Sequence, residues 1–292
     1  MLVTGAGRPF GERLAARLAN EDSIDRVIAV DTVAPRVALT GRTEFVRADI
    51  AHPLIGKVLE QAGVNTVVHT GGAGTGAVGV DVLLAACERS RTVTRVVAES
   101  STAVYPAYAG APAVHGEGVE VHDPLETALR AFARHRRDVT VTSLRFADIV
   151  GAGYRSTVVR RLAGPIVGVL GFDPTLQLLH IDDALEVATQ ACLERHPGAV
   201  NVAGAGVLTL TQLVRRAGRT RIAAPPLLAG AQACKLRFGR VVDTTRLATR
   251  FGYLPRYSTA AAWDDALGAA RRQFLPALAL GVVGTAERLV RA

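Results

Sequence analysis

The stretch VTGAGRPFGERL, residues 3–14, decides the fold. Its glycines, Gly5, Gly7 and Gly11, lie between an apolar strand at residues 1–5 and an amphipathic helix predicted over residues 8–20. In such a turn one glycine permits the tight bend, another lets a pyrophosphate approach the backbone, and the last allows close packing of helix on strand. The helix N-terminus then offers free N–H groups and a positive dipole end. The stretch therefore predicts a dinucleotide-binding turn.

Asp31, twenty residues after Gly11, supports this interpretation. It ends the second predicted strand, DRVIAVD at residues 25–31. A carboxylate at that place accepts both hydroxyl groups of the adenosine ribose and repels a 2′-phosphate, which predicts NAD in preference to NADP. The alternative is that Asp31 is an ordinary turn residue or helix cap.

Pro9 is irregular in this turn because proline has no backbone N–H to offer a pyrophosphate. Proline is nevertheless comfortable at the first position of a helix. The neighbouring Arg8 carries a guanidinium that can hold phosphate oxygens at two points. Two interpretations stay open: Arg8 replaces the missing donor, or it is a solvated arginine.

Outward from the turn, strands and helices alternate. Strands are predicted at residues 44–50, 65–72, 94–101 and 139–146, and helices at 52–62 and 80–90. Continuous Val/Ile runs in such an alternation are typical of parallel strands covered on both faces, so we expect an α/β fold with a doubly wound Rossmann sheet. After Gly151 the pattern loosens. We expect an NAD-binding domain over residues 1–150 and a smaller substrate lobe over 151–292, part of which returns to the sheet.

Composition excludes several functional classes. The net charge is +8, but aromatic residues make up 5% of the chain and the arginines are scattered, which argues against nucleic-acid binding. No run of 18 apolar residues predicts a membrane span, and no signal peptide is visible at residue 1. Three distant cysteines, Cys87, Cys192 and Cys234, fit a reducing cytoplasm and predict neither disulfides nor a metal site. The apolar tail, residues 273–292, is expected to pack in a core or between subunits.

Six segments, in order, resemble the extended short-chain dehydrogenases/reductases, especially the UDP-glucose 4-epimerase-like NAD-dependent epimerases and dehydratases. They are VTGAGRPFG (3–11), ADI (48–50), VVHTGG (67–72), ESSTAVY (99–105), LRFADIVGAG (144–153) and LLHIDDAL (178–185), with VVDTTRLATRFGYLP (241–255) as a late addition. Arg8 departs from the family by standing at its middle glycine. The resemblance implies cofactor contacts by Gly5, Gly7, Arg8, Phe10, Gly11, Asp31, Asp49, Ile50, His69, Thr70 and Gly71. It also implies that Ser101, beside Thr102, is the catalytic serine or threonine, and that the subunits form a homodimer through helices around 76–90 and 124–136.

The Tyr-x-x-x-Lys pair that the family uses for proton transfer is absent. None of the five tyrosines has a lysine four residues later. Counting back from LRFADIVG places Gly118 and His122 at the two positions and Glu126 at the acidic residue that follows them in the family. The sequence DPLE at 123–126 predicts a helix start, with Asp123 as N-cap, Pro124 at the first position and Glu126 closing a capping box. A helix that starts there cannot carry residues 118 and 122.

Replacements for the pair are few. His115, Glu117, Glu120 and His122 lie in the preceding loop, where they act as acid–base groups or are merely solvated. We name His122, with Ser101 and Thr102, as candidate catalytic residues, although Ser101 and Thr102 can also simply end a strand. Tyr105 and Tyr108 are candidate proton donors, and we expect Tyr105 to contact substrate.

The substrate side also departs from the family. Leu176 and Gln177 stand where epimerases carry a diphosphate-binding arginine, and Asp148 replaces a substrate-binding asparagine. Arg240 and Arg155, with Arg160 and Arg161, are candidates for a different anion site. His180 and Asp182 are expected to fix the packing of the lobes. The candidate substrate residues are therefore Tyr105, Asp148, Arg155, Gln177 and Arg240.

Three functions follow from these observations. The first is an NAD-dependent oxidoreductase of the epimerase/dehydratase type, acting on a hydroxyl- or carbonyl-bearing small molecule such as a nucleotide sugar. The second is a non-catalytic NAD-binding regulator or partner protein. The third is a pocket reused without hydride transfer.

Overall fold

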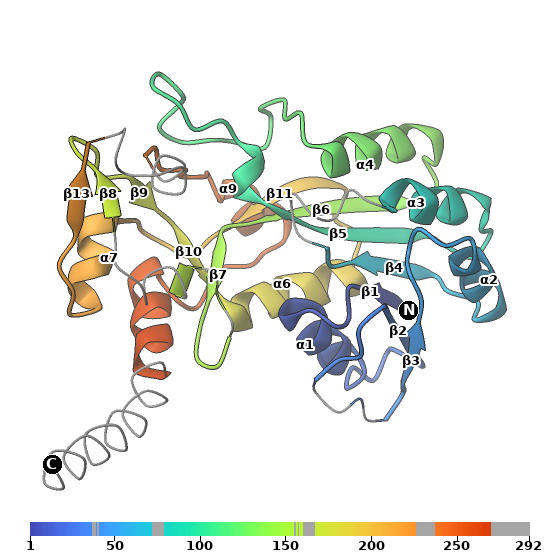
Figure 1. Cartoon of the computed structure of the whole chain (residues 1–292). Helices are drawn as coiled ribbons and strands as arrows, with labels where there is room; N and C mark the ends of the chain where they lie inside the picture. Colours follow the sequence, from blue (N-terminus) through green and yellow to red (C-terminus); the bar gives the residue numbers. More distant parts are fainter. Residues whose placement is uncertain are drawn as a thin grey trace, which may run out of the picture.

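The computed structural model describes residues 1–36, 39, 41–71, 79–154, 156, 158–159, 167–225 and 237–269. A seven-stranded, fully parallel sheet forms its centre (Figure 1). Its strands lie in the order β11 (Gly198–Val202), β6 (Thr140–Phe146), β5 (Arg95–Ser101), β4 (Thr66–His69), β1 (Leu2–Thr4), β2 (Val27–Asp31) and β3 (Thr43–Arg47). This doubly wound α/β sheet confirms the expected fold class.

Helices cover both faces of the sheet, and each face has its own apolar core. Helices α1 (Pro9–Leu18) and α6 (Ile181–Leu193) pack against one another on one face. Helices α2 (Leu54–Gln61), α3 (Val80–Arg89) and α4 (Pro124–His135) form a row on the other. Apolar residues recur along α1 at helical spacing, so that Leu14 and Leu18 are both fully buried. The layered core fixes the carboxyl ends of the strands in a rigid frame.

The strand order reverses beside β1, which pairs with β2 on one side and with β4 on the other. In open α/β sheets, ligands bind outside the carboxyl ends of the strands at this switch point. The glycine turn follows β1 at that place, and Asp31 ends the neighbouring β2. The topology therefore brings the predicted cofactor residues to one crevice.

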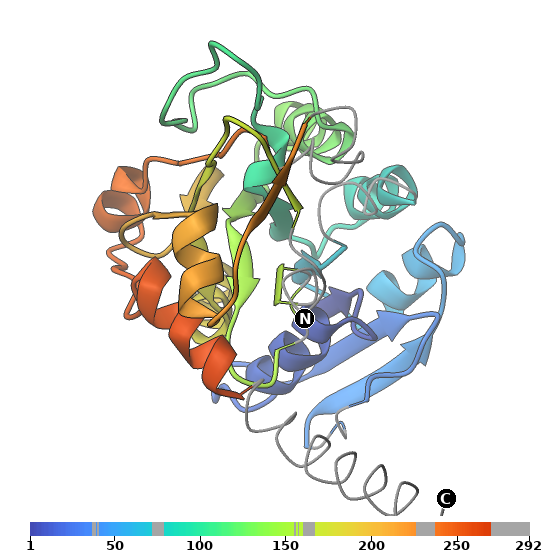
Figure 2. The same ribbon diagram turned by 60° about the vertical axis from the view of Figure 1, so that its left-hand side comes forward.

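The second lobe consists of small two-stranded sheets and short helices, and it lies beyond the end of the main sheet (Figure 2). The strands pair as β7 (Asp148–Val150) with β10 (Leu178–His180), β8 (Val167–Val169) with β13 (Ile222–Ala224), and β9 (Thr175–Leu176) with β12 (Leu208–Thr209). Its helices are α7 (Leu210–Arg216) and a helix over 259–269. The short 3-10 helix η1 (Thr102–Val104) follows β5 of the main sheet. Trp263 is fully buried in the core of this lobe.

Three elements from the second half of the chain belong with the main sheet. Strand β11 pairs in parallel with β6 as an edge strand, α6 covers the α1 face, and α9 (Thr245–Arg250) packs on β11. The compact unit around the main sheet therefore includes α6, β11 and α9 as well as the residues before Gly151.

No helix of the described residues is long and apolar enough to cross a membrane. The apolar tail over 273–292 and Cys234 lie outside the described residues. Cys87 and Cys192 are buried thiols, and burial raises the pKa of each to about 12. They are packed as small apolar groups rather than as reactive ones.

Candidate functional site

The turn after β1 requires glycine at two positions. Gly5 has a φ of +74°, in the left-handed region, and a Cβ there would lie 2.2 Å from the carbonyl oxygen of Thr70. A Cβ on Gly11 would lie 2.3 Å from the carbonyl oxygen of Gly5 and equally close to the Thr70 hydroxyl. Both contacts are far below van der Waals distance, so only glycine lets α1 pack directly on β1 and β4.

Gly7 couples this turn to Asp31. Its N–H donates a hydrogen bond of 2.9 Å to one carboxylate oxygen of Asp31. The other oxygen accepts from the backbone N–H of Val33 at 3.1 Å. A side chain at Gly7 would meet the carbonyl oxygen of Val33 at 2.3 Å. The carboxylate of Asp31 is thereby held in one orientation at the rim of the crevice.

A cavity of about 230 Å³ opens at this switch point. Seven of the predicted cofactor residues line it, and the structure thus brings them together: Gly5, Arg8, Asp31, Asp49, Ile50, His69 and Gly71. The cavity is a concave, mixed polar and apolar site of the kind that holds the adenosine end of a dinucleotide.

Hydrogen bonds hold three of the predicted cofactor residues, Asp49, His69 and Thr70, in place around this cavity. Asp49 uses one carboxylate oxygen to accept from the N–H of Ala51 at 2.9 Å, which fixes its side chain in the turn after β3. His69 and Thr70 both bond to Thr4, the histidine Nδ1 to the hydroxyl at 2.8 Å and the Thr70 hydroxyl to the carbonyl at 2.7 Å. These bonds join the ends of β1 and β4.

Phe10 and Thr70 are part of the wall rather than of the lining. Phe10 is buried and packs edge-to-face on Phe146, with ring centres 5.4 Å apart. The Thr70 side chain is buried against Gly11. Any contact of Phe10 with a phosphate would come from its backbone N–H in the first turn of α1, not from the ring.

Arg8 lines the cavity and is also exposed to solvent. It is the N-cap residue of α1, with Pro9 at the first helical position, and its side chain adds no capping bond. Its Nη1 instead donates a hydrogen bond of 2.6 Å to the carbonyl oxygen of Gly71, at the end of β4. The guanidinium therefore spans the crevice between α1 and β4. The phosphate-binding role of Arg8 stays a prediction.

Glu99, on β5, is an acidic group that the sequence analysis passed over. It is partly buried, and burial raises its pKa to about 7, although the charge of Arg8 acts to lower it. The signal was present as a single carboxylate inside the apolar strand VVAES. Such a group is costly to ionise unless it has a partner.

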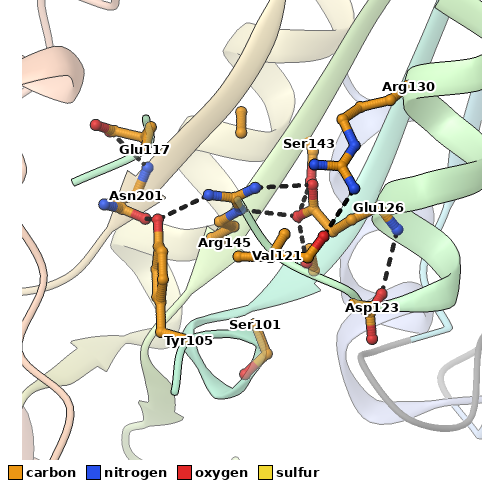
Figure 3. Close-up of polar contacts among 12 residues, drawn as sticks. Ser101, Tyr105, Glu117, Val121, Asp123, Glu126, Arg130, Ser143, Arg145 and Asn201 are labelled. Carbon is orange, nitrogen blue, oxygen red and sulfur yellow. Dashed lines mark hydrogen bonds and ion pairs between the residues drawn. The ribbon is translucent and has the colours of Figure 1, made fainter. Parts of the chain in front are cut away.

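A buried polar network lies on the opposite face of β5 and β6 (Figure 3). Glu126 and Arg145 each expose 2% of their surface and form a two-point ion pair, with N···O distances of 2.9 and 3.0 Å. Ser100 and Ser143 donate further hydrogen bonds to the Glu126 carboxylate. Burial would raise the pKa of Glu126, but the bonds and charge of Arg145, with the two serines, hold it below the usual range.

Asp123 is the N-cap of α4, as predicted, and accepts from the N–H of Glu126 at 3.2 Å. The predicted capping box is wrong, however. Its second half requires the Glu126 side chain to reach back to the N-cap, whereas that carboxylate turns inward to Arg145. The ion pair with a buried guanidinium prevails over a bond at the solvated helix end.

Tyr105 belongs to the same network, which corrects its expected role in contacting substrate. The residue is 1% exposed, and its hydroxyl donates to Asn201 at 2.7 Å and accepts from Arg145 at 2.8 Å. Its ring stacks on that of His115, with centres 4.9 Å apart. A hydroxyl with both bonds made inside the protein is not available as a proton donor to substrate. Tyr108, by contrast, is exposed.

Ser101 and Thr102 stand at the carboxyl end of β5, where the crevice lies, and both are partly buried. The Ser101 hydroxyl accepts from the N–H of Ala103 at 3.1 Å and so caps η1. Figure 3 shows Ser101 outside the Tyr105–Arg145–Glu126 network. Because the Ser101 oxygen acts only as an acceptor in this cap, the O–H group can still donate a hydrogen bond to a ligand.

The loop in front of α4 is anchored at two of the predicted acid–base groups. His115 is 1% exposed, and its backbone pairs with Val241 and Asp243 of the second lobe. Burial, with the nearby charge of Arg240, lowers the pKa of His115. Glu117 accepts from the N–H of Asn201 at 3.0 Å and covers the free edge of β11. Both have structural partners.

The other two groups of that loop, Glu120 and His122, are exposed. His122 makes no hydrogen bond or ion pair with any residue that the structure describes. A catalytic role for His122 requires the loop to move toward the crevice, and it stays a prediction.

The candidate substrate residues mostly hold the second lobe to the sheet. The Gln177 side chain accepts from the N–H of Val242 at 2.8 Å, and Arg240 donates to the carbonyl oxygen of Tyr105 at 2.8 Å. Burial lowers the pKa of Arg240, while the charge of the exposed Asp148 acts to raise it. Arg155, Arg160 and Arg161 lie outside the described residues. No three metal-ligating side chains come together within the described ranges.

His180 fixes the packing of the lobes, as expected. It is the N-cap of α6, its ring stacks on Tyr257 at 3.7 Å, and its Nε2 lies 3.0 Å from Asp265. The exposed Asp182 lies 3.5 Å from His180 Nδ1, and the next residue, Asp183, makes the contacts to residues 253–257 that the sequence analysis did not predict. Asp183 is fully buried and accepts from the Tyr253 hydroxyl and from the N–H groups of Arg256 and Tyr257.

Comparisons with known proteins place this geometry in context. No protein-family model matches the chain. Uncharacterized proteins of Mycobacterium tuberculosis and Mycobacterium bovis are each 38% identical to it over 309 aligned residues, covering 91% of this chain and 82% of the relative.

Several solved structures share its fold at low sequence identity. A UDP-glucose 4-epimerase from Thermotoga maritima with UDP-glucose gives a TM-score of 0.76 at 18% identity, covering 94% of this chain and 99% of the other. DesIV, a dTDP-glucose 4,6-dehydratase from Streptomyces venezuelae with NAD bound, gives 0.77 at 18%, covering 94% and 97%. MoeE5 in complex with UDP-glucose and NAD gives 0.72 at 20%, covering 94% and 99%.

Proposed function

Because the chain belongs to one family with the mycobacterial proteins and has the fold of the extended short-chain dehydrogenases/reductases, we propose that it is an NAD-dependent oxidoreductase of the epimerase/dehydratase type. Its substrate is a hydroxyl- or carbonyl-bearing small molecule, with nucleotide sugars as the first class to test. The observation that carries the proposal is the Asp31 carboxylate, held by Gly7 beside the glycine turn. The fold, the cavity and the NAD bound in the similar structures support it.

The residues of the turn fit a dinucleotide. Neighbouring atoms pack closely where a Cβ on Gly5, Gly7 or Gly11 would lie. Because these residues have no side chains, the N-terminus of α1 stays open toward the crevice. Gly5 and Arg8 would hold the pyrophosphate, and Asp31 and Asp49 the adenosine. NAD, when bound, supplies a hydride acceptor that can also return the hydride.

Preference for NAD over NADP follows from charge. Asp31 already accepts two backbone N–H groups, from Gly7 and Val33. It has lone pairs left for the ribose hydroxyl groups, and its negative charge repels a 2′-phosphate. Among the described residues that line the cavity, the cation is Arg8, which lies at the pyrophosphate end.

Calorimetric titration of the full-length protein with NAD and, in parallel, NADP tests this proposal. We expect NAD to bind and NADP to bind at least about tenfold more weakly, the factor that corresponds to about 1.4 kcal/mol. Asp31→Asn should reduce the difference, while Asp22→Asn, an exposed carboxylate on the far side of α1, should leave it unchanged. Equal binding of both nucleotides would refute the role of Asp31.

Proton transfer is where this chain departs from its fold relatives. Ser101 and Thr102 are the described hydroxyl groups at the end of β5, and either can hydrogen-bond a substrate hydroxyl or carbonyl. Without the usual pair, we expect turnover about a hundred- to ten-thousand-fold below that of an enzyme that retains such acid–base groups. Incubation with UDP-glucose or dTDP-glucose, followed by product analysis, tests for hydride transfer.

The alternative function is a non-catalytic NAD-binding protein. One observation favours it: His115 and Glu117, in the loop that stands where the catalytic turns would be, are engaged in structural contacts. NAD binding without conversion of any nucleotide sugar, and without reduction of bound NAD, would support this alternative over the first.

We further propose a homodimer that forms through α3 and α4. The two helices pack side by side on one face of the sheet and leave their outer surfaces available (Figure 1). Light scattering of the purified protein tests this, and a monomeric mass would refute it.

A further inference from the structure

A second cleft lies beside α4, on the side away from α3. Its volume is about 820 Å³, against about 230 Å³ for the crevice at the switch point, and the two share no lining residue among those that the structure describes. Helix α4 forms one wall, the start of β11 with α9 forms the other, and β6 forms the floor. A volume of this size is typical of sites that hold small molecules. The cleft therefore has room for a ligand of its own.

Alternate residues along β6, starting with Val139 just before the strand, form the floor of the cleft. Val139 and Val141 belong to the apolar core beneath α4, and Ser143 and Arg145 continue the row toward the carboxyl end of the strand. The charge of Arg145 is compensated there by the buried ion pair with Glu126 (Figure 3). The floor is thus apolar at one end and neutral overall at the other, so the net charge of the cleft comes from its walls.

The walls carry four arginines that form no ion pair with any residue that the structure describes. Arg130 and Arg134 lie one turn apart on α4, about 6 Å along the helix axis, and Arg137 follows the end of that helix. The fourth, Arg246, belongs to α9 on the opposite wall. Guanidinium groups in one cleft without a carboxylate partner leave it positively charged, because arginine is always protonated.

The half-buried arginines of the two walls bond only to neutral oxygen atoms. Arg130 donates to the carbonyl oxygen of Val121 at 2.7 Å and to the Thr127 hydroxyl at 3.3 Å (Figure 3). Arg246 donates to the carbonyl oxygen of Ala199 at 2.9 Å. These bonds fix the direction of each side chain, but a neutral acceptor does not cancel the charge. Both guanidinium groups are therefore oriented in advance for an anion.

Arg246 reaches the apolar end of the floor. Its Nη atoms lie 3.7 and 3.8 Å from the position that a Cβ on Gly198 would occupy. Gly198 pairs with Thr142 of β6, directly after Val141. Neighbouring strands are about 4.8 Å apart, so this guanidinium lies close to the edge of the floor. The arginines of α4 and α9 thus face one another across an apolar strip.

Two carboxylates line the other end of the cleft, in the loop before α4. Glu117 accepts from the N–H of Asn201 at 3.0 Å, and Glu120 is exposed. Neither pairs with a described arginine of the walls. The charge of the cleft is therefore divided along its length. An anionic group is attracted to the arginine end, while the hydroxyl groups of the same ligand can donate to the carboxylates.

We propose that this cleft is a second binding site, whose ligand is an organic phosphate that also carries hydroxyl groups: a nucleotide or a sugar phosphate. Arg134, Arg137 and Arg246 hold the phosphate groups, since a guanidinium can bind phosphate oxygens at two points. The apolar strip accepts the ring of the ligand, and Glu117 and Glu120 accept from its hydroxyl groups. The site is separate from the proposed NAD crevice and does not depend on it.

Calorimetry of the full-length protein tests the site with three separate probes: ADP, glucose 1-phosphate and inorganic pyrophosphate. At about 0.15 M salt, we expect at least one of the two organic probes to bind, and to bind more tightly than pyrophosphate, which has neither ring nor sugar hydroxyl groups. Tighter binding of ADP identifies a nucleotide site, and tighter binding of glucose 1-phosphate a sugar phosphate site. No heat from any probe up to about 1 mM would overturn the proposal.

Variants locate the bound probe in the cleft or in the crevice. The double variant Arg134→Gln/Arg137→Gln should weaken its binding at least about tenfold, because two charge-assisted contacts are lost. Arg8→Gln, in the crevice, should leave the affinity unchanged. The reverse pattern would place the probe in the crevice and refute the second site. Both exchanged residues of α4 are exposed, so the double variant should unfold at the same temperature as wild type.

A charge-matched control excludes simple attraction by the net charge of +8. Arg215→Gln/Arg250→Gln removes two other exposed arginines, one of them on α9, and neither lines the cleft. This variant should bind the probe as wild type does. Equal weakening in the two double variants would show that the arginines of the cleft have no special role. Failure of NAD to bind would refute the proposed function but leave every result of this comparison unaffected.

Discussion

Glu126 and Arg145 place a full ion pair inside the protein, between α4 and β6. Three hydroxyl groups support the pair: the Ser100 and Ser143 hydroxyl groups bond to the carboxylate, and the Tyr105 hydroxyl bonds to the guanidinium. Such a pair is worth little more than an apolar replacement of equal shape, but breaking it leaves an uncompensated buried charge. The network therefore holds α4 and β6 in one relative position, and removing either charged partner should destabilise the protein strongly.

Glu126→Gln should lower the free energy of unfolding by about 3–5 kcal/mol, because Arg145 then stays charged and buried without its partner. Urea unfolding measures this change. The matched control is Asp264→Asn, which breaks the exposed pair with Arg216 and should cost less than about 1 kcal/mol. A loss of similar size in both variants would contradict the role assigned to the buried network.

Glu99 should make stability depend on pH in the opposite sense to an ordinary paired carboxylate. Its folded pKa, about 7, lies above the value of 4.5 for a free glutamate. The folded state therefore loses stability as pH rises through about 7, where the carboxylate must ionise. Glu99→Gln should be more stable relative to wild type at about pH 8 than at about pH 5, as thermal unfolding can show. The reverse order would contradict the burial of a titrating carboxylate.

Helix α1 depends on one glycine in its first turn for its contact with the sheet. The carbonyl oxygen of Gly5 occupies the place of a Gly11 side chain, so the helix can approach β1 only there. At a second helical glycine, Gly56 in α2, an added Cβ would make ordinary van der Waals contacts, the nearest at 3.7 Å. We therefore expect alanine to have opposite effects on stability at positions 11 and 56.

Gly11→Ala should destabilise the protein and weaken NAD binding at least about tenfold, because α1 must shift away from the turn and carry its N-terminus with it. Gly56→Ala should stabilise by about 0.5–1 kcal/mol, since alanine loses less entropy than glycine in a helix. Thermal unfolding and NAD titration of both variants test this. A neutral Gly11→Ala would show that the close packing at this turn is not required.

The two parts of the molecule are joined by buried polar contacts of α6. Asp183 receives three hydrogen bonds from residues 253–257, and His180 stacks on Tyr257. These contacts close the second lobe over the carboxyl end of the sheet, where the crevice lies. The depth of any substrate site therefore depends on α6 as much as on the crevice residues.

Asp183→Ala should destabilise by about 1–3 kcal/mol for each buried donor left without its acceptor, and should make the second lobe more sensitive to protease. Asp182→Ala, at the next position of the same helix but exposed, is the control and should cost less than about 1 kcal/mol. Limited proteolysis with mapping of the first cleavage sites measures both. Equal protection in the two variants would contradict the assigned contact.

The sequence by itself determined the parallel sheet, the glycine turn after its first strand and the position of Asp31 at the end of the second. Glycine spacing, the strand-to-helix switch and a carboxylate at a strand end are short-range patterns that can be identified in the sequence without knowing which distant residues they contact. For the same reason Asp123 was identified as an N-cap and the helix start at Pro124 was predicted.

Only the tertiary structure decided which polar groups face inward. It buried Asp183 and left Asp182 exposed, turned Glu126 away from its helix end to Arg145, and buried Tyr105 and His115. Each choice depends on a partner far away in the sequence, as between Tyr105 and Asn201 or between Asp183 and Tyr257. Burial and pairing of charges are properties of the assembled layers, and a local pattern of residues does not contain them.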